Sequence, residues 1–121
     1  MSRVEAYRLQ TGQDAYDEVV GNEAQALLRH PALKNGTKRL LGWLQAIQAG
    51  QALPENEPEA PHEAGLSLRY RCDGDVVMMF DYLEDAGFLL VLAFAPSAMA
   101  LPTVETCRKA ANRRRNWSMS P

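Results

Sequence analysis

The sequence contains few of the residues that build cross-linked, metal-binding or membrane-spanning proteins. Among 121 residues there are two cysteines and two histidines, and no Cys-x-x-Cys or His-Glu-x-x-His spacing occurs. The sequence therefore predicts free thiols, no structural metal and no cofactor. The longest strongly apolar run, Phe88–Ala95, is too short to cross a bilayer, and the first residues lack the apolar stretch of a signal peptide. We expect a cytoplasmic protein that does not contact a membrane.

Aromatic residues are also scarce, at 7%, but hydrophobic residues make up 46% and charged residues 23% of the chain. These values are typical of a globular protein rather than of a disordered or fibrous one. Two separate cores in a chain of this length would each bury too little surface. We expect residues 1–121 to form a single domain.

Charge is distributed unevenly along the chain. Residues 1–107 contain fifteen acidic and eight basic residues, whereas residues 108–121 contain five basic residues and no acidic one. This asymmetry indicates an anion-binding tail, but a solvated helix end or a contact with the protein's own acidic body produces the same pattern. All three interpretations stay open at this point.

The first half of the sequence predicts a short strand and then a helical hairpin. Residues Val4–Leu9 favour a strand. From Asp14 onward, apolar residues recur every three or four positions, as on one face of a helix, and Pro31 interrupts that pattern. A second helix is expected from Thr37, as its N-cap, to about Gly50, after an Asn-Gly turn. Its apolar stripe consists of Leu40, Trp43, Leu44 and Ile47.

A Pro/Glu-rich stretch separates this hairpin from the second half of the chain. Residues 51–64 contain three prolines and four glutamates, a composition that favours a solvated surface loop. Such a long loop is either a variable insertion or a segment that becomes ordered on a partner.

Three consecutive strands are expected after the loop. The alternation in Leu66–Cys72 places Arg69 and Arg71 on the face opposite the core, and strands at Val76–Leu83 and Phe88–Ala95 follow after short turns. The last strand is apolar on both faces, which indicates a central position with cover on each side.

A short C-terminal helix is expected to begin at Pro102 and to run to about Trp117. The predicted fold is α+β: a small antiparallel sheet, made of the N-terminal strand plus a three-strand meander, with the N-terminal αα-hairpin on one face and a short C-terminal helix.

Two segments resemble the RelE/ParE toxin superfamily. The segment GLSLRYRCDGDVVMMF at 65–80 is similar to that superfamily's Gly-Leu-Tyr-Arg-x-Arg strand and the strand after it. The segment LPTVETCRKAANRRR at 101–115 resembles the Thr-Pro-x-x-Glu-x-x-x-Ala-x-x-Arg ending of HigB-like and related phage-derived members. The resemblance covers most of the chain.

The resemblance implies a metal-independent endoribonuclease that cuts mRNA on the ribosome, with a cognate antitoxin as partner. It implies a basic cleft on the face opposite the helical hairpin. Arg69 and Arg71 would hold phosphate, and His62 or Asp81 would transfer protons, since this chemistry needs fixed positive charge and a proton acceptor. The nucleic-acid-binding residues would lie in the tail: Arg108, Lys109, Arg113, Arg114, Arg115 and Trp117.

The sequence also departs from the family pattern. Many members carry an arginine where this chain has Val76 and Val77, and HigB-like chains carry a lysine pair where this chain has residues 95–98. An alternative is therefore a non-catalytic phage or mobile-element protein that inhibits a host protein or a nucleic-acid complex. Under that alternative, Arg69 and Arg71 would solvate the sheet or pair with Asp81 across the ladder.

Overall fold

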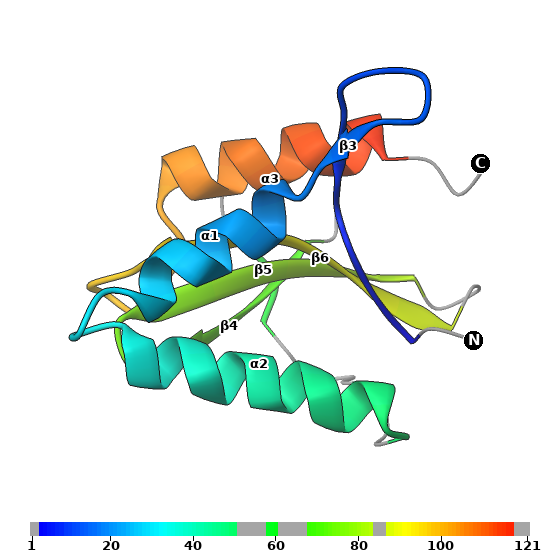
Figure 1. Ribbon diagram of the computed structural model, residues 1–121. Coiled ribbons are helices and arrows are strands. Elements are labelled where there is room, and N and C mark those ends of the chain that lie inside the picture. Colours follow the sequence, from blue (N-terminus) through cyan, green and yellow to red (C-terminus); the bar gives the residue numbers. More distant parts are fainter. Residues whose placement is uncertain (1–2, 51–57, 61–67, 84–86, 118–121) are drawn as a thin grey trace.

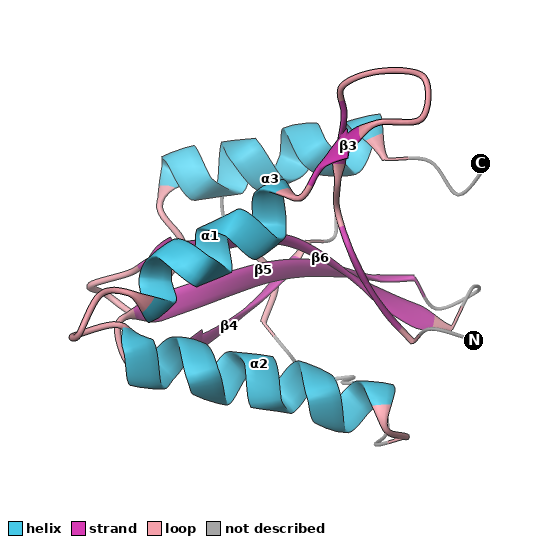
Figure 2. Ribbon diagram, in the orientation of Figure 1, coloured by secondary structure: helices cyan, strands magenta, loops and turns pink. Residues whose placement is uncertain are grey.

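In the computed structural model, the described residues are 3–50, 58–60, 68–83 and 87–117. Within them the protein has three helices, a four-stranded sheet and a two-stranded ribbon, which confirms the predicted α+β class (Figure 2). The elements in chain order are β1 (Val4–Ala6), β2 (Leu9–Gln10), β3 (Tyr16–Asp17), α1 (Val19–Leu28), α2 (Lys34–Gln48), β4 (Arg69–Asp73), β5 (Val76–Leu83), β6 (Phe88–Pro96) and α3 (Val104–Asn116).

The main sheet has the strand order β1-β6-β5-β4. Strands β4, β5 and β6 form the expected antiparallel meander, and Gly74 makes the first turn with a φ of 58° that favours glycine. Strand β1 runs parallel to β6, so the sheet is mixed, and the expectation of an antiparallel sheet is wrong on this point. Alternation shows which side chains share a face but carries no information about strand direction.

Strand β6 is central and is covered on both faces, as its apolar sequence predicted. Helix α2 packs on one face of the sheet and α3 packs on the other, while α1 lies between them along β6 and contacts α2 (Figure 1). The expectation that both helices of the hairpin lie on one face is therefore wrong for α1. Every residue from Leu89 to Ala95 is buried as a result. The protein is thus built in three layers, α2, the sheet and α3, with α1 alongside β6.

The helical hairpin differs from the prediction at the start of each helix. Tyr16 pairs with Gln10 in the β2-β3 ribbon, so α1 begins at Val19 rather than near Asp14. Helix α2 begins at Lys34, and the hydroxyl of Thr37 donates a hydrogen bond of 2.9 Å to the Leu33 carbonyl inside the helix. The prediction of Thr37 as an N-cap, which relied on local turn chemistry, is therefore wrong.

Gly36, expected in a turn, lies in the first turn of α2. A Cβ added to Gly36 would lie 2.3 Å from the carbonyl oxygen of Asp73 at the end of β4. The absence of a side chain therefore lets α2 approach the β4–β5 turn closely. This contact outweighs the preference of Asn-Gly for a turn.

The C-terminal helix begins two residues later than expected. Thr103 is its N-cap, and its hydroxyl accepts a 3.1 Å hydrogen bond from the Thr106 amide. The prediction had Pro102 as the first helical residue. Pro102 instead lies before the N-cap, because a threonine hydroxyl satisfies one of the amides left open at a helix start.

Part of the predicted 51–64 loop belongs to the sheet. Glu59 forms an isolated antiparallel bridge with Arg69 at the outer edge of β4. The Ala60 amide donates to the Leu68 carbonyl at 2.8 Å, and the Tyr70 amide donates to the Pro58 carbonyl at 3.2 Å. The expectation that this stretch forms only a solvated loop is therefore wrong for residues 58–60, and the rest of it lies outside the described residues.

None of the helices in the described part of the chain combines the length and the apolar character that crossing a membrane requires.

Candidate nucleic-acid interface

Arg69 and Arg71 lie on the same face of β4, as their spacing predicted, but that face is the one covered by α2. Arg69 is paired in register with Phe80, and Arg71 with Met78. The ring of Phe80 packs against Trp43 of α2, with 5.7 Å between the ring centroids. The expectation that the two arginines face a cleft opposite the helical hairpin is therefore wrong.

The guanidinium of Arg71 stacks on an aromatic ring. Its Cζ atom lies 4.5 Å from the ring centroid of Trp43, which is within the range of a cation–π contact. Trp43 was expected in the core, yet it is only partly buried, and its ring contacts both Phe80 and Arg71. An arginine and a tryptophan from two different elements are thus held together at the surface.

Two further arginines lie beside this stack. Arg39 of α2 donates a 2.7 Å hydrogen bond from Nε to the Asp73 carboxylate at the end of β4. Arg69 lies 3.6 Å from Glu59, measured between side-chain nitrogen and oxygen. We call the set Arg39, Trp43, Arg69 and Arg71 the arginine–tryptophan surface. Arg39 and Arg69 each lie beside a carboxylate, and Arg71 contacts the Trp43 ring.

Asp81 lies on the opposite face of the sheet from Arg69 and Arg71. Because Arg69 is in register with Phe80, the next residue along β5 points to the other face. There the Asp81 carboxylate accepts a hydrogen bond from Nε of Arg114 on α3. The structure therefore does not bring together the acid and the two cations that the resemblance assigned to one site, and the alternative pairing of Asp81 with Arg69 or Arg71 is also wrong.

His62, the second candidate for proton transfer, lies outside the described residues.

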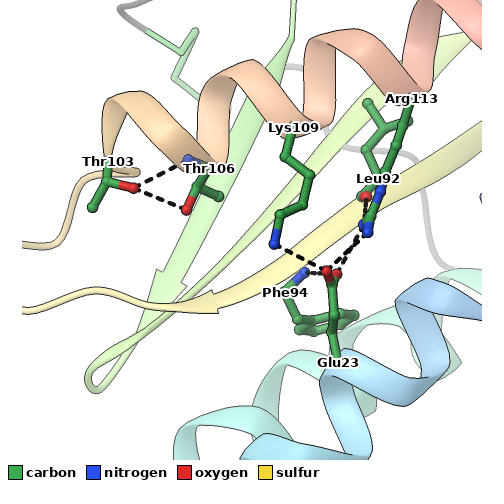
Figure 3. Close-up of polar contacts among 7 residues, drawn as sticks. All are labelled: Glu23, Leu92, Phe94, Thr103, Thr106, Lys109 and Arg113. Atoms are coloured by element: carbon green, nitrogen blue, oxygen red, sulfur yellow. Dashed lines mark hydrogen bonds and ion pairs between the residues drawn. The ribbon is translucent and has the colours of Figure 1, made fainter.

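Most cations of the predicted nucleic-acid-binding tail contact the protein itself. Lys109 and Arg113 contact the carboxylate of Glu23 on α1, at 3.2 Å and 2.9 Å (Figure 3). Arg114 pairs with Asp81, and Arg115 donates to the Asn112 side chain at 3.3 Å. Arg108 remains exposed. The tail thus holds α3 onto the body of the protein.

Trp117 also packs against the protein. The ring centroid of Trp117 lies 5.7 Å from that of Phe88 in an edge-to-face arrangement. The guanidinium of Arg114 lies 5.6 Å from the Trp117 ring centroid. Trp117 is partly buried against the core. Trp117, predicted to bind nucleic acid, thus contacts Phe88 and Arg114 of the protein itself.

Glu23 was not predicted, although it makes more polar contacts than any other described acidic side chain. It shares its two oxygens among the Arg113 guanidinium, the Lys109 ammonium and the Phe94 amide. In the sequence, Glu23 is one of the polar residues of a predicted amphipathic helix, and it lies 86 positions before Lys109. The sequence contains no signal that links residues so far apart.

The two cysteines are free thiols. Cys107 is buried, whereas Cys72 is partly buried, and this burial raises the pKa of the Cys72 thiol above its ordinary value. Across the described residues, no three His, Cys, Asp or Glu side chains gather as a metal site would require.

Comparisons with protein-family models, with curated proteins and with solved structures gave no match for this chain.

Proposed function

We propose that the chain is a non-catalytic binding protein that holds a nucleic-acid strand on the arginine–tryptophan surface. The observation that carries this proposal is the stack of Arg71 on Trp43, 4.5 Å from ring centroid to guanidinium carbon. Arg39 and Arg69 add two more guanidinium groups on the same side of the sheet, each beside a carboxylate.

The residue types of this surface suit a nucleic-acid strand. A guanidinium binds phosphate oxygens through its N–H edge while its planar face stacks on an aromatic ring. A partly exposed indole ring stacks on bases of any sequence. The whole chain carries a net charge of −2, so attraction of phosphate depends on this local concentration of arginines rather than on overall charge.

The placement of Asp81 supports the non-catalytic part of the proposal. Metal-independent RNA cleavage needs a proton acceptor close to the phosphate that the cations hold. Asp81 is separated from Arg69 and Arg71 by the sheet, its side chain is only 16% exposed, and it is engaged by Arg114. An acid placed in this way serves the attachment of α3 rather than proton transfer.

Binding is tested by fluorescence anisotropy of a labelled single-stranded RNA with the purified full chain. Arg71→Gln should weaken binding about tenfold, which corresponds to about 1.4 kcal/mol, and should lower the salt slope by about one. Arg8→Gln is the matched control, because Arg8 also stacks at 4.5 Å, over Tyr16 on the β2-β3 ribbon. Equal weakening in both variants would contradict the assignment of the surface.

Catalysis is tested on ribosomes programmed with a defined mRNA. We expect the message to stay intact in the presence of the wild-type chain. If the wild-type chain cleaves the message and the Arg71→Gln variant does not, the non-catalytic part of the proposal is overturned and the binding surface stays in place.

A second candidate is a RelE/ParE-like toxin of the HigB type, with residues 1–121 as its single domain. The order of elements favours it: an N-terminal strand, a helical hairpin, a three-strand meander and a C-terminal helix, with β1 beside β6. Its partners would be a cognate antitoxin, the ribosome and mRNA. Expression of the chain alone in bacteria should then arrest growth and produce cut mRNA, whereas normal growth at high expression removes this candidate.

A further inference from the structure

The carboxylate of Glu23 is enclosed by hydrogen-bond donors from two other elements. Arg113 of α3 donates from two nitrogens, at 2.9 Å to Oε1 and 3.0 Å to Oε2, and Lys109 donates at 3.2 Å to Oε2. The backbone amide of Phe94 in β6 completes the set at 3.2 Å to Oε1 (Figure 3). A single anionic group thus receives four hydrogen bonds.

The position of this cluster is fixed by a bulge in β6. Val91 pairs with Phe80 and Ala93 with Met79, so Leu92 has no partner in β5. Pairing with β1 also ends here, because the last bond joins the Tyr7 amide to the Val91 carbonyl at 2.9 Å. Beyond that point, Arg113 donates to the Leu92 carbonyl at 2.7 Å and Glu23 accepts from the Phe94 amide. Bulges commonly end strand pairing and redirect a strand in this way.

The donors are held in place by groups other than Glu23. The Phe94 amide belongs to a buried central strand, and the Arg113 guanidinium is fixed by the Leu92 carbonyl and lies 5.8 Å from the ring of Tyr7. Glu23 reaches the donors from α1, which lies along β6. The receptor and its occupant therefore come from separate elements.

The donor set matches the chemistry of anion recognition. A bidentate guanidinium, an ammonium and a backbone amide are the groups that bind carboxylate and phosphate in proteins. The site is also reachable from solvent, because the Lys109 side chain is 43% exposed and that of Glu23 is 19% exposed.

We propose that Arg113, Lys109 and the Phe94 amide form a binding site for one carboxylate or phosphate group, and that Glu23 is its built-in ligand, which an incoming anion replaces. Replacement breaks the connection between α1 and α3 at this edge. The site is separate from the arginine–tryptophan surface, so it does not depend on the proposed function.

The test is chemical rescue of the Glu23→Ala variant of the full chain. We expect this variant to unfold at a lower temperature than the wild type. Acetate or inorganic phosphate should then raise its Tm in a saturable way, by roughly 5 °C at ten times the dissociation constant of the anion. Comparing the concentrations at which acetate and inorganic phosphate raise the Tm shows whether the site prefers a carboxylate or a phosphate group. Sodium chloride at matched ionic strength is the control for screening.

The double variant Glu23→Ala/Arg113→Gln lacks both the Glu23 carboxylate and the bidentate donor. Acetate or phosphate should change its Tm only as much as sodium chloride does. An equal rescue of both variants, or no saturable rescue of Glu23→Ala, overturns the proposal.

A second measurement covers the case in which Glu23→Ala does not fold. Phosphate added to the ¹⁵N-labelled wild-type chain should move the amide resonance of Phe94 in a saturable way as Glu23 is replaced. The Thr106 amide, which donates to the Thr103 hydroxyl at the far end of α3, is the internal control. Shifts of equal size at both amides, or no saturable shift at Phe94, contradict the site.

Discussion

The close approach of α2 to the β4–β5 turn predicts opposite effects for two glycine-to-alanine changes in the same helix. A Cβ at Gly36 would lie 2.3 Å from the Asp73 carbonyl oxygen and 3.1 Å from its carbonyl carbon. A Cβ at Gly42, which is exposed and lies less than two turns further along α2, would meet nothing within 4 Å. The two substitutions add the same methyl group to the same helix, and they differ in the atoms that this methyl group meets.

The magnitudes follow from helix propensity and from the cost of overpacking. Alanine at an exposed interior position of a helix stabilises by about 1 kcal/mol over glycine, so Gly42→Ala should raise the free energy of unfolding by that amount. At Gly36 the same gain is opposed by a clash with backbone atoms, which cannot rotate away. Overpacking of this kind costs up to about 3 kcal/mol, which leaves a net loss of about 2 kcal/mol.

The assay is thermal unfolding followed by circular dichroism, with urea unfolding as a second measure. At roughly 4 °C per kcal/mol for a domain of this size, Gly42→Ala should unfold about 4 °C above the wild type and Gly36→Ala about 8 °C below it. A Gly36→Ala variant as stable as the wild type would show that α2 does not pack on β4 at this distance, and would refute the reasoning.

Three further predictions concern other parts of the protein. Thr103→Ala removes the N-cap of α3 and should lower the free energy of unfolding by about 1 kcal/mol in urea unfolding, whereas Thr103→Ser should restore it. Because burial raises the pKa of Cys72, its thiolate forms at higher pH than that of an exposed cysteine. Alkylation by iodoacetamide at pH 8 should therefore be slower than for free cysteine and should rise steeply with pH, while the buried Cys107 should react only on unfolding. Finally, Asp81→Asn and Arg114→Gln should destabilise non-additively, with a coupling of about 1 kcal/mol in a double-mutant cycle; full additivity would mean that this pair does not hold α3.

The sequence predicted the elements whose hydrophobic period is strong and whose neighbours in space are also neighbours in the chain. The meander of β4, β5 and β6 follows from strict alternation and short turns, and the burial of β6 on both faces follows from its apolar sequence. The alternation of Arg69 and Arg71 was also correct. Each of these features depends on local pattern alone.

The side of the sheet on which those arginines lie could not be read from the same pattern. Alternation divides the side chains of β4 between two faces without saying which helix covers each face. Arg71 meets Trp43 because α2 packs on that side, held close by the missing side chain of Gly36. A helix covering one face therefore decides whether an arginine of a half-polar strand faces solvent or an aromatic ring.

The charge pattern of the basic tail also could not show where its cations bind. Five cations in residues 108–115 predicted an anion-binding tail as readily as a contact with the acidic body of the protein. The structure favours the second interpretation, because Glu23 engages two of these cations and Asp81 engages a third. Each of these ion pairs spans at least 33 positions of sequence. A count of charge along the chain therefore identifies which residues are able to bind an anion, whereas the fold determines whether that anion belongs to a partner or to the protein itself. For Lys109 and Arg113 it is the protein's own Glu23, and an external anion must compete with it.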